Sequence, residues 1–147
     1  MTDVAHILAV LVAVSNGLAG IVSGFLWWRV EPQPFAWVLI RTGQALAVAQ
    51  AIGAGVLAAS GLDPDDSLYW LYALLPVAVG FVAEQLRLAS AQQVLDVRDL
   101  EDAQAVGRLP ADEQQSVVLQ IVRRELGVMA AAALVTCFLA LRALGTV

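Results

Sequence analysis

The chain has 147 residues, of which 60% are hydrophobic and only 14% are charged, and its mean hydropathy is +0.77. It is far more apolar than an ordinary soluble domain, so we expect the excess apolar surface to face lipid. Eight arginines and thirteen acidic residues leave a net charge of −5, which argues against a nucleic-acid partner. The single cysteine, Cys137, excludes an intramolecular disulfide and a metal site built from several cysteines.

Four apolar stretches are long enough to cross the hydrocarbon core of a bilayer, which takes about 20 helical residues. They cover residues 4–28, 35–60, 68–88 and 126–144. Because a spanning segment must satisfy its own backbone groups, and because these stretches lack the period-two alternation of a barrel strand, we expect helices. The sequence therefore predicts an all-α protein with one domain, residues 1–147, that forms a four-transmembrane-helix bundle with antiparallel, up-down connectivity.

The first two helices are expected to pack as a hairpin. No basic region of the kind that opens a secretory signal peptide precedes residues 4–28, so we expect this segment to be retained. The connection at residues 31–34 holds Pro32 and Pro34, and proline suits a helix start but not a helix interior. Residues 61–67 form a short acidic connection made of turn residues, which leads into the third helix.

Small residues indicate where helices approach closely. Gly20 and Gly24 form a GxxxG pattern in the first helix, and small side chains let helix backbones come together. The simplest interpretation is close packing of the first helix against the second, and homodimerisation through the glycine face is the alternative. The expected packing glycines are Gly17, Gly20, Gly24 and Gly53.

The third and fourth helices are expected to extend beyond the membrane. No helix breaker appears after residue 88 until Gly107, so the third helix should project into water. Pro110 fits the first turn of a further helix, where Asp112 and Glu113 favour the positive end of the dipole. Residues 89–125 then form a polar helical segment, whose mixed charges are typical of a solvated surface or of a docking surface for a partner.

The positions of the arginines predict the orientation, because cytoplasmic flanks of membrane helices carry an excess of positive side chains. Only Arg142 falls near the opposite side of the predicted topology. We therefore expect a multi-pass protein of a bacterial cytoplasmic membrane, with both termini outside and residues 89–125 in the cytoplasm. The arginines on the predicted cytoplasmic side are Arg29, Arg41, Arg87, Arg98, Arg108, Arg123 and Arg124.

Glu84 is the most informative residue, since a carboxylate in an apolar span is costly and normally needs a partner. Arg87 follows three residues later on the same helix, and Arg41 lies at a similar expected depth in the second helix. One interpretation is an ion pair that fixes the register of two helices. The expected intramembrane polar cluster comprises Arg41, Gln44, Glu84, Gln85 and Arg87.

The other interpretation of this cluster is a proton or ion relay. A relay across the bilayer would need polar side chains that continue along one face. Gln50 falls on roughly the opposite side of the second helix from Arg41, at about 100° per residue. Either Gln50 meets a different helix or there is no pathway.

Bound haem is not expected in a single chain. Haem held between helices takes two axial histidines, or one histidine and one methionine. His6, the only histidine, lies near the outer end of the first helix, whereas Met129 lies near the cytoplasmic start of the fourth. Haem bridged by two copies stays open; otherwise His6 is an interfacial residue bonded to water, a headgroup or Tyr69. We find no catalytic motif and expect neither an enzyme nor a bound cofactor or metal.

Two stretches are distinctive: FVAEQLRLASAQ at residues 81–92 and DAQAVGRLP at residues 102–110. With them, the chain resembles small four-span integral membrane proteins of bacteria whose proteomes are rich in arginine and alanine. This resemblance implies the four-helix architecture and no particular activity. The chain also loosely resembles the four-helix bundles of membrane b-type cytochromes, which would imply haem.

Three functional hypotheses follow from the sequence. The preferred one is an accessory or interaction subunit that works in a homo-oligomer or with another membrane protein. The second is a minimal proton-coupled transporter or carrier in which Glu84 takes up and releases the proton. The third is a haem- or quinone-binding electron carrier.

Overall fold

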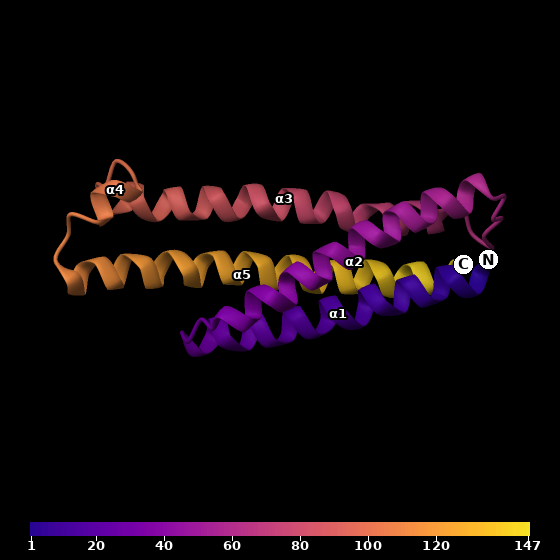
Figure 1. Ribbon diagram of the computed structural model, residues 1–147, viewed down its shortest axis with the longest axis horizontal. Coiled ribbons are helices and arrows are strands. Elements are labelled where there is room, and N and C mark those ends of the chain that lie inside the picture. The colour runs from indigo at the N-terminus through magenta and orange to yellow at the C-terminus, as the bar shows by residue number, and fades with distance from the viewer.

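The computed structural model describes residues 1–147 and contains helices but no strands. The long helices are α1 (Thr2–Arg29), α2 (Pro34–Ala59), α3 (Leu68–Val97) and α5 (Ala111–Leu144), and α4 (Ala103–Val106) is one short turn (Figure 1). All four long helices are long and apolar enough to cross a membrane. The expected all-α class with four long apolar helices is confirmed, and it indicates a multi-pass membrane protein.

Local signals explain most helix boundaries. α1 ends where Val30 takes a left-handed conformation, with φ of 58°, and donates its N–H to the Leu26 and Trp27 carbonyls in the last turn of the helix. α2 begins at Pro34, as proline's fixed φ favours. α3 ends at Val97, ten residues before Gly107, and α5 begins at Ala111, one residue after Pro110. The Asp102 side chain accepts a hydrogen bond from the Ala105 N–H and starts α4.

The four long helices pack in the cyclic order α2, α1, α5, α3. α5 has extensive contacts with both α1 and α3, and α1 packs along α2, whereas the contact that closes the ring, α2 with α3, is much smaller. Figure 1 shows α3 and α5 continuing side by side beyond the end of α1 and α2, and it shows both chain termini at the opposite end of the molecule. The helical continuation of the third and fourth spans is therefore present.

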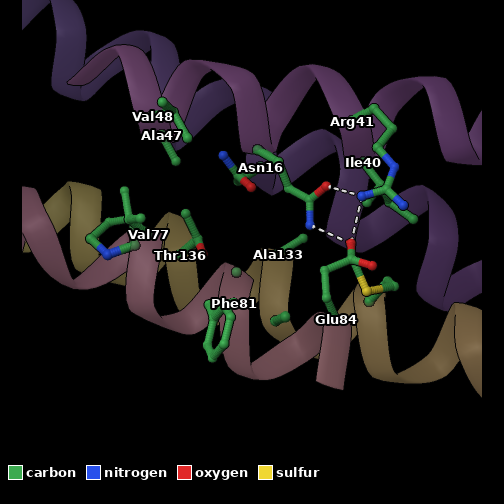
Figure 2. A pocket seen from close by; sticks show the side chains of 15 residues that line it. Asn16, Ile40, Arg41, Ala47, Val48, Val77, Phe81, Glu84, Ala133 and Thr136 are labelled. Atoms are coloured by element: carbon green, nitrogen blue, oxygen red, sulfur yellow. Dashed lines mark hydrogen bonds and ion pairs between the residues drawn. The ribbon is translucent and has the colours of Figure 1, made fainter. Parts of the chain in front are cut away.

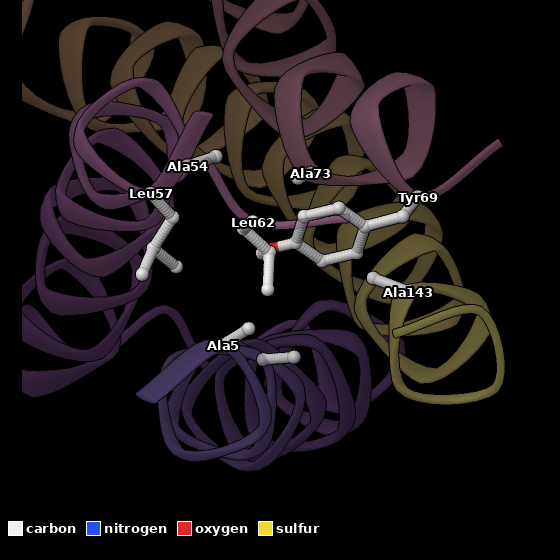
Figure 3. Packing of buried hydrophobic residues seen from close by; sticks show 8 residues of the cluster. Ala5, Ala54, Leu57, Leu62, Tyr69, Ala73 and Ala143 are labelled. Carbon is white, nitrogen blue, oxygen red and sulfur yellow. The ribbon is translucent and has the colours of Figure 1, made fainter. Parts of the chain in front are cut away.

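Alanine dominates the interior, and large apolar side chains dominate the surface. At the end near the termini, Ala5, Ala54, Ala73 and Ala143 surround Tyr69, whose ring reaches from α3 into the centre of the bundle (Figure 3). Only 33 of 147 residues are buried, while Ile21 and Phe81 are 66% and 67% exposed. Such a surface is unfavourable in water and suits hydrocarbon.

The glycine-rich face of α1 packs on α5, so the expectation that it packs on α2 was wrong. A Cβ at Gly20 would lie 2.7 Å from the side chain of Leu134, and one at Gly17 would lie 3.2 Å from Cys137 Sγ. A Cβ at Gly24 would meet open space. Among the four, Gly53 alone joins α1 to α2, since its Cβ would lie 2.5 Å from Leu8. A GxxxG pattern shows that a face is flat but not which helix covers it.

Candidate functional site

Glu84 is the centre of a polar cluster that joins α2 to α3. Its Oε1 accepts hydrogen bonds from Arg41 Nη1 at 2.5 Å and from Gln44 Nε2 at 3.0 Å, and Figure 2 shows both bonds crossing between the helices. Its Oε2 accepts from Arg87 Nε at 3.0 Å. Arg41 Nη1 also donates to Gln44 Oε1 at 2.6 Å. Both carboxylate oxygens are thus occupied by charged or amide donors.

Arg87 extends the cluster to α5. Its Nη1 lies 3.4 Å from Glu125 Oε1, and its guanidinium stands 5.8 Å from the centre of the Trp37 ring. Glu125 was missed by sequence reasoning because it follows Arg123 and Arg124 and looked like part of a solvated flank. A signal was present: it comes directly before the buried Leu126, at the start of the apolar stretch.

Gln85 does not belong to the cluster, contrary to expectation. It is exposed and makes no side-chain hydrogen bond. Neighbouring helix residues point about 100° apart, so Gln85 does not share the direction in which Glu84 faces α2. Four of the five expected members, Arg41, Gln44, Glu84 and Arg87, are brought together.

The cluster is neutral in total, but its outer side is positive. Two arginines balance Glu84 and Glu125. The side chain of Arg41 is 51% exposed, whereas those of Glu84, Arg87 and Glu125 are 26%, 22% and 15% exposed. Only Nη1 of Arg41 takes part in the cluster, which leaves its Nε and Nη2 free to donate. The charge available to a neighbouring molecule is therefore that of Arg41.

A cavity of about 280 Å³ adjoins the cluster between α2 and α3 (Figure 2). α5 and α1 form its floor, with Met129 and Ala133 from α5 and Asn16 from α1. Most of the wall is apolar. The polar residues along it are Asn16, Arg41, Gln44, Glu84 and Thr136. The cavity lies where α2 and α3 make little contact, so the cluster closes one end of an otherwise open seam.

Asn16 makes a second polar link, between α1 and α2. Its Nδ2 donates to the Gly43 carbonyl at 3.1 Å and to the Val12 carbonyl of its own helix at 3.0 Å. A Cβ at Gly43 would lie only 2.7 Å from Asn16 Oδ1, so glycine is what lets the amide reach the backbone of α2. This link holds the two helices in register.

Two buried polar side chains stand apart from the cluster. Gln50 is 1% exposed and neither its Oε1 nor its Nε2 has a hydrogen-bond partner, and Ser23 Oγ is likewise buried and unpaired. Neither residue lines the cavity beside Glu84. The polar groups therefore do not continue as a hydrogen-bonded chain from Glu84 through the bundle.

The residues considered for haem lie far apart in the packing. His6 is exposed, and its Nδ1 lies 2.9 Å from the Thr2 carbonyl oxygen. Its neighbour Ala5 belongs to the core around Tyr69, whereas Met129 belongs to the core that contains Leu26 and Ile40. Across the whole chain, no three His, Cys, Asp or Glu side chains gather as metal ligands would.

The continuation of α3 and α5 has a small core of its own. Val94 and Val117, each 0% exposed, pack with Leu95 and Val106 in the segment that we call the projection, residues 89–125. Hydrogen bonds flank this core, from Arg98 Nη2 to Gln120 Oε1 at 3.0 Å and from Arg124 Nη1 to Gln93 Oε1 at 2.8 Å. The projection is therefore a packed unit and not two separate helix ends.

An apolar groove lies where the projection meets the connection between α1 and α2. Val118 and Leu119 of α5 are 48% and 40% exposed there, next to Trp37. The residues lining the groove are Pro32, Gln33, Pro34, Trp37, Gln115, Val118, Leu119 and Val122. These exposed apolar side chains belong to the most polar stretch of the sequence.

No protein-family model, curated protein or solved structure matches the chain.

Proposed function

We propose that the chain is a small accessory or interaction subunit of a complex in a bacterial cytoplasmic membrane. Its four helices cross the bilayer in up-down order, with both termini outside and the projection in the cytoplasm. The arginine distribution supports this orientation, since seven of the eight arginines belong to the predicted cytoplasmic side. The observation that carries the proposal is the packed projection with its apolar groove.

The projection is not needed to anchor the chain in the membrane, because the four apolar stretches are already long enough to cross the bilayer. Ordering a segment costs conformational entropy, and here the small core around Val94 and Val117 offsets that cost. What the ordered segment presents at the membrane surface is the groove that contains Val118, Leu119 and Trp37. Exposed apolar patches with polar surroundings are typical of protein interaction sites.

The Glu84 cluster supports the same proposal as a structural element. Glu84 has three donors from two helices, and removing it would deprive two arginines at membrane depth of the carboxylate that they share. An ion pair between two helices can fix their register even where it adds little to the net stability. The cluster adjoins the projection through Glu125 and links α2, α3 and α5 next to the groove that Trp37 lines.

Purification in mild detergent at native abundance, with mass spectrometry of the bound proteins, tests the proposal. We expect reproducible partners with the unmodified chain and about tenfold less recovery with Val118→Asp, because the new charge would be buried at the interface. Val97→Asp is the matched control, since Val97 is 70% exposed on the projection but lies outside the groove. A lone chain or homo-oligomer without partners, or equal loss in both variants, would contradict the proposal.

A proton-coupled carrier is the second candidate, and one observation favours it: Glu84 lines the cavity. Glu84→Gln separates the two functions. Lost assembly supports the structural role, whereas retained assembly with lost proton flux supports a carrier. An absorption spectrum of the purified protein tests the haem- or quinone-binding alternative, for which a Soret band would be the haem signature.

A further inference from the structure

The cavity between α2 and α3 opens at the surface that faces lipid. Its rim includes Val48 and Phe81, which are 47% and 67% exposed. Its inner wall is formed by buried residues such as Ile40 and Met129, which are 2% and 1% exposed. A hydrocarbon chain would enter from the bilayer between apolar rim residues, because the charged groups all stand at the cluster end and only the uncharged Asn16 and Thr136 add polar groups to the inner wall (Figure 2).

The polar end of the cavity presents a cation. Arg41 is the most exposed member of the cluster, and its Nε and Nη2 are free. The Glu84 carboxylate beside it is already occupied by its three donors. A planar guanidinium with free donors suits a phosphate group. Charge complementarity therefore favours an anionic head at this end.

The depth of Arg41 fits a lipid phosphate. Arg41 lies seven residues into α2, which is about 10 Å along the axis from Pro34, and one turn beyond Trp37. Tryptophan is enriched at the headgroup level, and a long arginine side chain can extend toward that level while its stem stays in hydrocarbon. The guanidinium and a phosphate can thus meet at the interface while the rest of the lipid follows the helices.

We propose that the α2–α3 cavity is a specific binding site for one phospholipid, whose phosphate binds Arg41 and one of whose acyl chains occupies the cavity. The cavity volume of about 280 Å³ is close to the lower end of small-molecule pockets, which begin near about 300 Å³. The bound chain fills the seam where α2 and α3 make little contact. The site is separate from the groove on the projection, so it does not depend on the proposed partner.

Native mass spectrometry of the full chain, stripped of lipid and titrated with phosphatidylglycerol, tests the site. The decisive variant is Gly80→Leu, because Gly80 lines the cavity and a Cβ there meets open space, so the leucine fills the cavity and leaves the cluster intact. Gly55→Leu is the matched control, since Gly55 also has open space but lies outside the cavity. Arg41→Gln tests the phosphate contact.

We expect one tightly bound phosphatidylglycerol on the unmodified chain and on Gly55→Leu. Affinity should fall by about tenfold or more in Gly80→Leu and in Arg41→Gln, because one variant occupies the cavity and the other loses charge-assisted hydrogen bonds. Diacylglycerol with the same acyl chains, which lacks the phosphate, should bind the unmodified chain about tenfold more weakly. Unchanged affinity in Gly80→Leu, or equal binding of the two lipids, would overturn the proposal.

Discussion

The α1–α5 interface and the α2–α3 seam join helices by opposite means. Between α1 and α5, small residues bring the backbones together, as where Gly20 meets Leu134. Between α2 and α3, contact is sparse and the charged cluster around Glu84 forms the link beside a cavity. In hydrocarbon, van der Waals packing and interhelical hydrogen bonds both join helices, and the first dominates between α1 and α5 whereas the second dominates between α2 and α3. The packed side supplies rigidity, and the polar side leaves room for a ligand.

Substitutions at the α1–α5 interface should lower the free energy of unfolding more than substitutions at the α2–α3 seam. Gly20→Leu is expected to lower the free energy of unfolding by about 3 kcal/mol, because the new side chain would overlap Leu134. Gly24→Leu, four residues later, should change it by less than about 0.5 kcal/mol, because its Cβ meets open space. Denaturation of both variants in detergent measures the difference. Equal losses would mean that the two glycines are equivalent and that α1 does not pack on α5 in this way.

The polar seam should respond to loss of its acceptor. Glu84→Ala leaves Arg41 and Arg87 without their shared carboxylate, and we expect a loss of about 1–2 kcal/mol, since both arginines are partly exposed. Gln85→Ala is the control, because Gln85 is exposed and makes no side-chain hydrogen bond, and it should be neutral. Thermal unfolding in detergent measures both. A neutral Glu84→Ala would show that the seam does not depend on the cluster.

The polar link between α1 and α2 gives a finer comparison. Asn16→Ala removes the hydrogen bond to the Gly43 carbonyl and leaves a small void, which should cost about 1 kcal/mol. Ser15→Ala removes a bond to the Val12 carbonyl within α1 only, so it should cost little. The same unfolding measurement compares them, and equal costs would argue against an interhelical role for Asn16.

The smallest expected change in the free energy of unfolding is a gain and not a loss. Gln50→Leu replaces a buried amide that has no hydrogen-bond partner, and we expect a gain of up to about 1 kcal/mol. Gln44→Leu, in the same helix, removes the donor to Glu84 and should instead destabilise. Unfolding midpoints of the pair measure this contrast. Destabilisation by Gln50→Leu would reveal a polar role for Gln50 within the bundle.

The sequence by itself determined the helices and most of the cluster. Hydropathy and proline placement located α1 and α2 within two residues of their ends, since both depend on local composition. Because a charge in an apolar span is costly and needs a partner, Glu84 led to the prediction that Arg41 and Arg87 lie beside it. The separation of Gln85 from the cluster was also predictable in part, because two helical steps of about 100° place Gln85 about 160° from Arg87 around the helix.

Only the tertiary structure decided which helix covers which face. That α1 places Gly17 and Gly20 on α5, that Asn16 reaches Gly43, and that Glu125 joins Arg87 all depend on helix rotation and neighbour order. In an apolar helix, the residues that face lipid and those that face the core are both hydrophobic. The sequence pattern therefore does not show which face of a helix meets which neighbour. The cavity has the same origin, because it arises where α2 and α3 diverge and no local pattern encodes the distance between two helices.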